Sequence, residues 1–307
     1  MDFGLVSAIG AAVVWGTYIF VLKRSFSGYP PAGLTVLINA SAIAWFLPVT
    51  VATTDVSAIG AASGSESTGA VGRLVRAVAG VDPAAVAVVA GTAAATAAAF
   101  VLFLRAIEEG DVSYVTPINK VVPMFVLPLE VLLLGEVLAP IQVAGVVVAT
   151  AAVYVANYEP GSLIAPLVGA VHSRPAQLAL VSAACYAVAD LGKRVGLQEL
   201  AIPGTLWVPL LLTGAGLILL PAAIRNPPAV TRADAPKFVA GGALVALGEH
   251  LTTIAFTALP ASVASPVINT QAIVAVVLGG VILGERYFRV RLAAALLAVV
   301  GVGMIAL

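Results

Sequence analysis

Three ionisable residues lie deep inside apolar segments of this chain, where they could bind a charged molecule or carry a proton. Lys120 lies about nine residues into the apolar segment 112–133, and Glu249 and His250 lie about thirteen residues into the segment 237–257. At a helical rise of about 1.5 Å per residue, all three are predicted near the middle of a membrane. An ionisable group at that depth costs about 2.5–3.5 kcal/mol on insertion scales, so each of them requires a function or a partner.

We interpret Lys120 and Glu249 as charged groups facing a central cavity, where they pair with each other or contact a zwitterionic substrate. Proton coupling is assigned to Glu249 or His250, because a carboxylate or an imidazole can gain and lose a proton. The alternative is a fixed buried ion pair between Lys120 and Glu249 that only sets helix register. Adjacent helical residues point about 100° apart, so Glu249 and His250 cannot both face the cavity, and packing is the simpler role for His250.

Uncharged polar side chains accompany these groups in the apolar segments. The candidates for further substrate contacts are Asn39, Asn119, Asn269 and Gln271. Hydrogen bonding between helices is the alternative role for these amides. Asp190 precedes Lys193 and Arg194 by three and four residues, a spacing that favours a salt bridge at the membrane surface.

The composition is that of an integral membrane protein. Of 307 residues, 61% are hydrophobic and 10% are charged, and the mean hydropathy is +1.09. Fifteen basic and fifteen acidic residues cancel, so charge gives no indication of nucleic-acid binding. With two histidines and one cysteine, a metal site is not expected, and no cofactor is indicated.

Ten apolar segments are long enough to span a membrane, which requires about 20 residues. They lie at about 3–22, 32–52, 83–104, 112–133, 139–157, 176–195, 203–223, 237–257, 261–283 and 288–307. The predicted fold is therefore an all-α integral membrane protein with ten transmembrane helices.

The chain contains an internal repeat. Ser113-Tyr-Val-Thr-Pro117 and Leu134-Gly135-Glu136 recur as Ser262-Val-Ala-Ser-Pro266 and Leu283-Gly284-Glu285, at one offset (262 − 113, 266 − 117 and 285 − 136 each give 149). The repeat divides the segments five and five, and an odd number of crossings per half predicts two inverted repeats. The halves are predicted at 1–157, with a loop insertion at about 53–82, and at 176–307, joined by a loop at 158–175.

Prolines and carboxylates recur at matching places in the two copies. Pro117, Pro123 and Pro266 each remove a backbone N–H, so we expect kinked helices that line the cavity and act as hinges; packing alone is the alternative. Glu136 and Glu285 begin short loops, and a gating role is one assignment for them. The other is structural, as a cap on the following helix or, for Glu285, a pair with Arg286.

Several short motifs carry a family resemblance. They are Trp15-Gly16, Pro123 thirteen residues before Glu136, Gln142-x-x-Gly145, Leu283-Gly284-Glu285, Val300-Gly301-Val302 and the string Pro117-Ile118-Asn119-Lys120. With these the chain resembles the EamA domain of the drug/metabolite transporter superfamily, in two copies. The resemblance implies two inverted five-helix halves, alternating access, usually export of small metabolites, and usually cytoplasmic termini. Many members carry an Arg near the position of Asn39, so recognition of an anion by that Arg is not available here.

Two indications of orientation point in opposite directions. Ten Lys and Arg residues follow odd-numbered segments and four follow even-numbered ones, which places both termini outside. The resemblance places them in the cytoplasm. The orientation is therefore left open for a multi-pass protein of the cytoplasmic membrane.

The function that these features favour is secondary transport of a small organic metabolite, amino-acid-like or drug-like, by alternating access. Proton coupling and exchange are both compatible with it. A lipid-carrier flippase on the same scaffold is the alternative, and it requires a lateral opening and a basic headgroup pocket. A membrane-embedded enzyme is disfavoured, because the sequence has no His-Glu-x-x-His or Gly-x-Ser-x-Gly motif, and it also has no phosphate-binding loop. The expected partners are the substrate and membrane lipids; a monomer suffices, and a homodimer is compatible.

Overall fold

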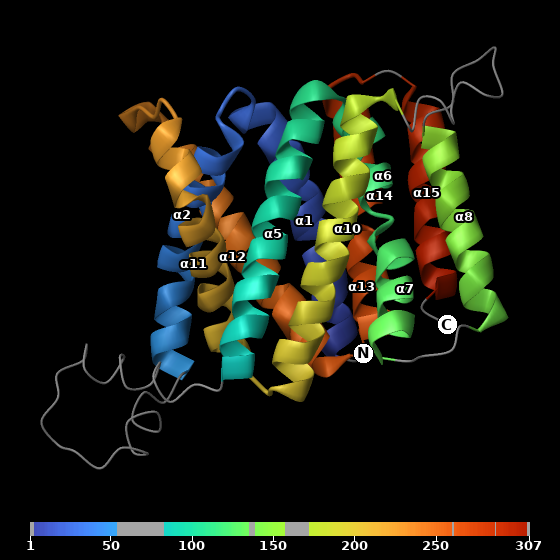
Figure 1. Ribbon diagram of the computed structural model, residues 1–307. Coiled ribbons are helices and arrows are strands. Elements are labelled where there is room, and N and C mark those ends of the chain that lie inside the picture. The colour runs from blue at the N-terminus through green and yellow to red at the C-terminus, as the bar shows by residue number, and fades with distance from the viewer. Residues whose placement is uncertain are drawn as a thin grey trace, which may run out of the picture.

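Helices make up all the regular structure in the part of the chain that the computed structural model describes, residues 3–53, 83–134, 139–156, 172–259, 261–285 and 287–305 (Figure 1). Six of them are long and apolar enough to cross a membrane. These six are α1 (Phe3–Phe26), α2 (Pro31–Thr53), α5 (Pro83–Glu109), α10 (Arg174–Arg194), α11 (Gly204–Arg225) and α12 (Ala235–Ala258). An all-helical membrane protein is therefore confirmed.

The remaining helices are shorter. They are α6 (Val112–Asn119), α7 (Val122–Leu134), α8 (Pro140–Ala156), α13 (Ala261–Asn269), α14 (Gln271–Ile282) and α15 (Phe288–Ile305), with a π-helical turn η1 (Val195–Glu199) after α10 and a 3-10 turn η2 (Arg232–Asp234) before α12. Helices dominate because a backbone in lipid must satisfy its own hydrogen bonds. Most of the predicted insertion at 53–82 and of the predicted loop at 158–175 lies outside the described residues.

The helices form a bundle with side-by-side pairs. The most extensive contacts join α8 with α15, α5 with α10, α1 with α12, and α2 with α11, while α6 lies against α14 and α15. Helices from the first part of the chain therefore pack mainly against helices from the second part, and both termini lie at the same end of the bundle (Figure 1).

The segment 112–133 forms two helices instead of the single kinked helix that we expected. Helix α6 ends with a bond from the Lys120 N–H to the carbonyl of Thr116 (3.0 Å), and a new turn begins as the Met124 N–H donates to Val121 (2.9 Å). Pro123 explains the break, because it has no N–H to continue the first helix and its ring would clash with the carbonyl four residues before.

The segment 261–283 is also broken, at Thr270, although no proline stands at the position equivalent to Pro123. There the Thr270 hydroxyl and N–H both donate to the carbonyl of Val267, at 2.7 and 3.2 Å. A side chain that bonds a backbone carbonyl competes with the regular helical bond. The two halves thus reach similar breaks by different means, with Lys120 and Asn269 at equivalent repeat positions (269 − 120 = 149).

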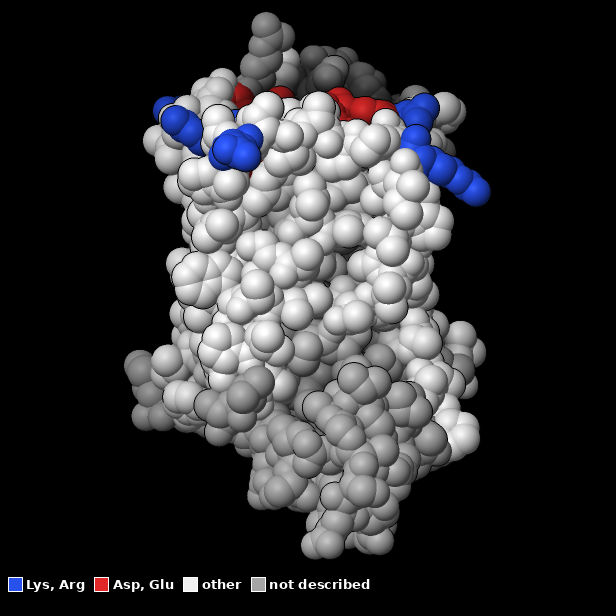
Figure 2. Space-filling view, turned by 90° about the vertical axis from the view of Figure 1, so that its left-hand side faces the viewer, with Lys and Arg blue, Asp and Glu red and all other residues white. Residues whose placement is uncertain are grey.

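Basic side chains gather at one end of the bundle. Figure 2 shows them above a broad band without charged side chains, at the end opposite the two termini of Figure 1. Lys23 and Arg24 end α1 there, Arg225 ends α11, and Arg174 begins α10. An uncharged band of this kind is what a lipid-facing surface requires.

Close helix contact beside the cavity predicts a stability effect at Gly16. A Cβ there would lie 2.5 Å from the Cβ of Val274 and 2.8 Å from the carbonyl oxygen of Gln271. Because a backbone atom cannot rotate away, Gly16→Ala is expected to destabilise the protein by about 1–3 kcal/mol, measured as a lower melting temperature in detergent. The control is Gly91→Ala, on an exposed helix face with no atom within 4 Å, where alanine should stabilise the helix. Equal melting temperatures for the two variants would contradict this packing.

Candidate substrate-binding site

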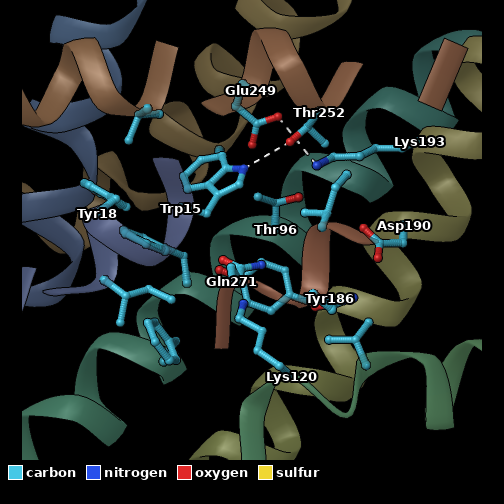
Figure 3. Close-up of a pocket in the computed structure, with 18 of the residues that line it drawn as sticks. Trp15, Tyr18, Thr96, Lys120, Tyr186, Asp190, Lys193, Glu249, Thr252 and Gln271 are labelled. Atoms are coloured by element: carbon cyan, nitrogen blue, oxygen red, sulfur yellow. Dashed lines mark hydrogen bonds and ion pairs between the residues drawn. The ribbon is translucent and has the colours of Figure 1, made fainter. Parts of the chain in front are cut away.

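A cavity lies in the middle of the bundle and is lined by residues from α1, α2, α5, α10, α11 and α12 and from both broken pairs. The cavity has a volume of about 120 Å³. Four charged side chains line it, Lys120, Asp190, Lys193 and Glu249 (Figure 3). Two cations and two anions give an interior without net charge, which suits an electrically neutral or zwitterionic ligand.

Lys120 enters the cavity from the end of α6. Lys120 is 8% exposed. Its Nζ lies 5.5 Å from the ring centre of Phe103 and 5.0 Å from that of Tyr186. Such cation–π contacts contribute up to about 2 kcal/mol when desolvated. Among the described residues no carboxylate is within ion-pair distance of this ammonium, so the predicted pair with Glu249 is absent. Asp190 attracts this ammonium from beyond ion-pair distance, which leaves room for direct contact with an anionic group of a ligand.

Glu249 pairs with Lys193 instead. The distance from Lys193 Nζ to Glu249 Oε2 is 3.5 Å, with the two side chains 12% and 8% exposed. The contact is an ion pair without hydrogen-bond geometry, since Oε2 accepts no hydrogen bond from the described residues. Figure 3 shows this pair on the side of the cavity opposite Lys120, so charges of opposite sign face a ligand from two sides.

Asp190 lies in the cavity and not at the membrane surface where we expected it. The Ser265 hydroxyl donates to its Oδ2 at 3.3 Å, and both residues line the cavity. The reason is that the helix does not end at residue 195 as predicted: η1 continues it to Glu199, which leaves Asp190 more than two turns from the end.

Three buried polar atoms of the lining have no hydrogen-bond partner among the described residues. They are the hydroxyls of Tyr18 and Thr96 and the Oε2 of Glu249. Nearby, the Trp15 Nε1–H donates to the Thr252 hydroxyl at 3.0 Å. Buried polar atoms nearly always have partners, so these three are suited to contact a ligand or water inside the cavity.

The predicted amides divide between the cavity and the helix contacts. Asn39, Asn269 and Gln271 line the cavity, where Asn39 Nδ2 also donates to the carbonyl of Leu212 (3.2 Å) and Asn269 Nδ2 to that of Ser265 (2.9 Å). Asn119 is buried outside the cavity lining. Its Nδ2 donates to α10, to the carbonyl of Ala179 (3.2 Å) and the hydroxyl of Ser182 (2.9 Å).

His250 lies apart from the cavity lining, as its angular separation from Glu249 requires. Its ring packs edge-on against Phe46 of α2, with ring centres 5.4 Å apart. It is therefore placed as a packing residue between α2 and α12. Among the described residues, no group of three or more His, Cys, Asp or Glu side chains could hold a metal ion.

Glu285 binds the amino end of α6, a contact between distant parts of the chain. Its carboxylate accepts hydrogen bonds from the N–H groups of Val112 (2.9 Å) and Ser113 (2.8 Å). The neighbouring Arg291 donates to Asp111 Oδ2 at 2.7 Å and to the Ser113 hydroxyl at 2.9 Å. We call these four bonds the latch. Glu285 thus caps a helix of the other half. Its predicted pair with Arg286 involves a residue outside those that the structure describes.

The other predicted hinge and gate residues are placed as follows. Pro117 lies inside α6, Pro123 follows the first residue of α7, and Pro266 lies inside α13. The side chain of Pro266 and all of Glu136 lie outside what the structure describes.

Sequence reasoning missed part of the site. Tyr186, Asp190 and Lys193 follow one another at spacings of four and three, which places them on one face of α10. That polar stripe in an apolar segment was the available signal. Trp15 and Tyr18 also line the cavity, and in a membrane helix nothing in the sequence separates such aromatic residues from ones that only pack between helices.

Comparisons with known proteins identify the fold and the family. The sequence profile of the EamA-like transporter family matches residues 2–158 and again residues 174–307, which confirms the predicted resemblance. A solved structure described only as the crystal structure of a protein superposes with a TM-score of 0.66 at 16% identity, covering 99% of this chain and 96% of that one. At this identity the superposition shows the fold alone. None of the curated proteins matches.

Proposed function

Since the chain belongs to the EamA-like transporter family, we propose that it is a secondary transporter of a small zwitterionic metabolite of amino-acid type, working by alternating access in the cytoplasmic membrane. It is a multi-pass membrane protein, and a transporter of this family acts on a small molecule. The observation that carries the choice of substrate is the buried Lys120 ammonium, which forms no ion pair among the described residues and points into the cavity (Figure 3).

The transport scaffold in this proposal has ten transmembrane helices in two inverted halves, 1–157 and 176–307. Two features of the packing support it. Helices α1 and α10 are the first helices of the two halves, and α5 and α12 are the third. The first helix of each half packs against the third helix of the other, α1 on α12 and α10 on α5, as a two-fold repeat predicts. The two broken helices also open at equivalent repeat positions, Lys120 and Asn269. Rocking of such halves about a fixed central site is the usual basis of alternating access.

The substrate would lie between the two charged sides of the cavity. Its carboxylate contacts the Lys120 ammonium, and its ammonium group contacts Glu249, whose Oε2 has no hydrogen-bond donor among the described residues. Asn39, Asn269 and Gln271 supply neutral hydrogen bonds. Aromatic walls from Trp15, Phe100 and the other ring-bearing lining residues leave room for an apolar side chain.

Glu249 is the proposed coupling group, because it faces the cavity and can be reached by both substrate and proton. His250 would influence coupling only through its contact with α2, since its ring lies against Phe46. Asn119 would act on transport through the position of Lys120, which follows it directly at the end of α6.

The latch serves as the gate at the basic end of the bundle. It joins α6 of the first half to the residues between α14 and α15 of the second, and the sliding of one half past the other must break it. Pro117, Pro123 and Pro266 are the proposed hinges, because each removes a backbone bond in a helix that meets the cavity.

Uptake into proteoliposomes tests the function. The purified protein is reconstituted, and uptake is measured for amino acids, nucleosides, polyamines and drug-like cations, with and without an imposed pH gradient. Saturable uptake of an amino acid supports the proposal. Binding of lipid-linked sugars alone would support a flippase instead. An uptake rate that is the same with and without the pH gradient would contradict proton coupling.

A further inference from the structure

Lys193 and Lys23 occupy equivalent positions in the two halves, yet their side chains do different things. The first and sixth predicted segments match at an offset of 170 (193 − 23), which aligns the two lysines. The Lys23 ammonium donates to the backbone carbonyls of Ile107 and Gly110, the latter at 3.0 Å, near the end of α5. It therefore holds the end of that helix, a structural role. Lys193 instead reaches Glu249 in the cavity.

A glutamine has taken over the structural role in the second half. The repeat partners of Ile107 and Gly110 are Phe256 and Leu259 (256 − 107 and 259 − 110 both give 149). Their carbonyls accept hydrogen bonds from the Nε2 of Gln198, at 3.0 and 3.4 Å. Because Gln198 satisfies these carbonyls, Lys193 is not needed at the end of α12 and is free to enter the cavity.

The contact that Lys193 makes there is one that a ligand can replace. The Nζ of Lys193 stands 3.5 Å from Glu249 Oε2 without forming a hydrogen bond to it. One turn earlier on α10 lies Asp190, whose carboxylate receives only the long hydroxyl bond from Ser265 among the described residues. A lysine at i+3 can reach an aspartate at i on the same helix. Lys193 therefore has a second carboxylate within reach if Glu249 is occupied.

We propose that Lys193 is a tethered substitute for the ammonium group of the substrate, an inference that rests on the proposed function. In the empty carrier it neutralises Glu249. When a zwitterionic substrate binds, the substrate's ammonium takes Glu249 and Lys193 moves to Asp190. The carboxylate of Glu249 is thus paired in both states.

The pairing of Lys193 with Glu249 in the empty carrier determines whether the protein performs only exchange or also net transport. A carrier that would have to reorient with an unpaired buried carboxylate meets a high barrier, because a lone charge in the membrane interior is costly. Such a carrier returns only with substrate bound and performs exchange. With Lys193 on Glu249, and with Asp190 within electrostatic reach of both Lys193 and Lys120, each carboxylate of the empty carrier has a cation nearby. The empty carrier can therefore return, so this protein performs net transport as well as exchange.

Two transport measurements on the same vesicles test the inference. A radiolabelled mixture of the protein amino acids is offered to vesicles that are empty, which reports net transport, and to vesicles preloaded with the unlabelled mixture, which reports exchange. The ratio of the two rates is independent of the amount of folded carrier. For the unaltered protein, net transport is expected within about tenfold of exchange; in Lys193→Met the ratio is expected to fall by roughly 100-fold.

Matched variants separate this inference from the proposed function. Lys23→Met should lower the melting temperature and leave the ratio of the two rates unchanged, and Lys193→Gln should repeat the effect of Lys193→Met if the latter is poorly folded. An unaltered protein that only exchanges, or Lys193 variants with an unchanged ratio, would overturn the inference while the transport function stands. Absence of amino-acid transport in both modes would remove the proposed function itself.

Discussion

Lys120→Met is expected to abolish transport while the protein still folds. The variant removes the proposed partner of the substrate carboxylate, and truncating one member of a buried charged pair costs about 2–5 kcal/mol, or roughly 30- to 5,000-fold in affinity. Folding should be retained because Lys120 has no ion-pair partner among the described residues, so no described carboxylate is left unpaired by the change. Initial uptake rates in proteoliposomes and the melting temperature in detergent are the two measurements.

A surface lysine provides the control for that variant. Lys237, near the start of α12, pairs with Asp234 at 2.9 Å outside the cavity lining, and Lys237→Met should leave transport within about twofold, as expected for an exposed ion pair. If Lys120→Met instead fails to fold, Lys120 is a structural residue, and its assignment to the substrate carboxylate is wrong.

Arg291→Met is expected to release the latch and change which side of the protein is open. Arg291 is 11% exposed at its side chain and holds both Asp111 and Ser113. Hydrogen bonds to a charged group contribute about 1.5–3 kcal/mol. Because Asp111 is 43% exposed, we expect a shift of about 1–3 kcal/mol, or roughly 5- to 150-fold, in the balance between closed and open states.

Cysteine labelling can detect that shift. Thr35 is buried, lines the cavity and lies one turn from the start of α2, at the end where the latch lies. In a Cys185→Ala background, Thr35→Cys should react faster with a membrane-impermeant maleimide when Arg291→Met is added. Arg289→Met, an exposed change on the same helix, should leave the rate unaltered. Equal labelling in all three proteins would mean that the latch does not close this end.

The ion pair of the latch, between Asp111 and Arg291, has no counterpart at the repeat positions of the two halves. At the repeat positions of Asp111 and Arg291 the sequence has Pro260 and Gln142 (260 − 111 and 291 − 142 both give 149). The ion pair therefore cannot form a second time. A charge-assisted bond is roughly twice as strong as a neutral one, so the two ends of the carrier are expected to open with different ease.

That Lys120 and Glu249 lie deep in the bundle could be predicted from sequence, but their partners and the position of Asp190 could not. Counting residues placed Lys120 and Glu249 near the membrane centre, and both line the cavity. The pairing of Glu249 with Lys193 depends on how α10 and α12 approach each other, and periodicity within one helix carries no information on that distance. Asp190 was misplaced for a related reason, because the π-helical turn that extends α10 has no distinct sequence signal.

The segment 112–133 shows which helix breaks can be predicted from proline positions in the sequence. Pro123 predicted a disturbance of the helix and the structure has a break there, yet the second copy breaks at Thr270 without a proline at the equivalent position. That second break depends on side-chain bonds from Thr270 and Asn269 to nearby carbonyls. Polar side chains in a helix can bond to carbonyls or to solvent, and only the packed structure determines which.

Binding of two matched ligands tests most directly whether Lys120 holds the substrate carboxylate. Calorimetry compares an amino acid that the protein transports with the amine obtained from it by decarboxylation, on the unaltered protein and on Lys120→Met. The unaltered protein should bind the amino acid roughly 30- to 5,000-fold more tightly than the amine, and Lys120→Met should bind both with similar affinity. Equal affinities in the unaltered protein, or a preference for the amino acid that survives in Lys120→Met, would contradict this account of the site.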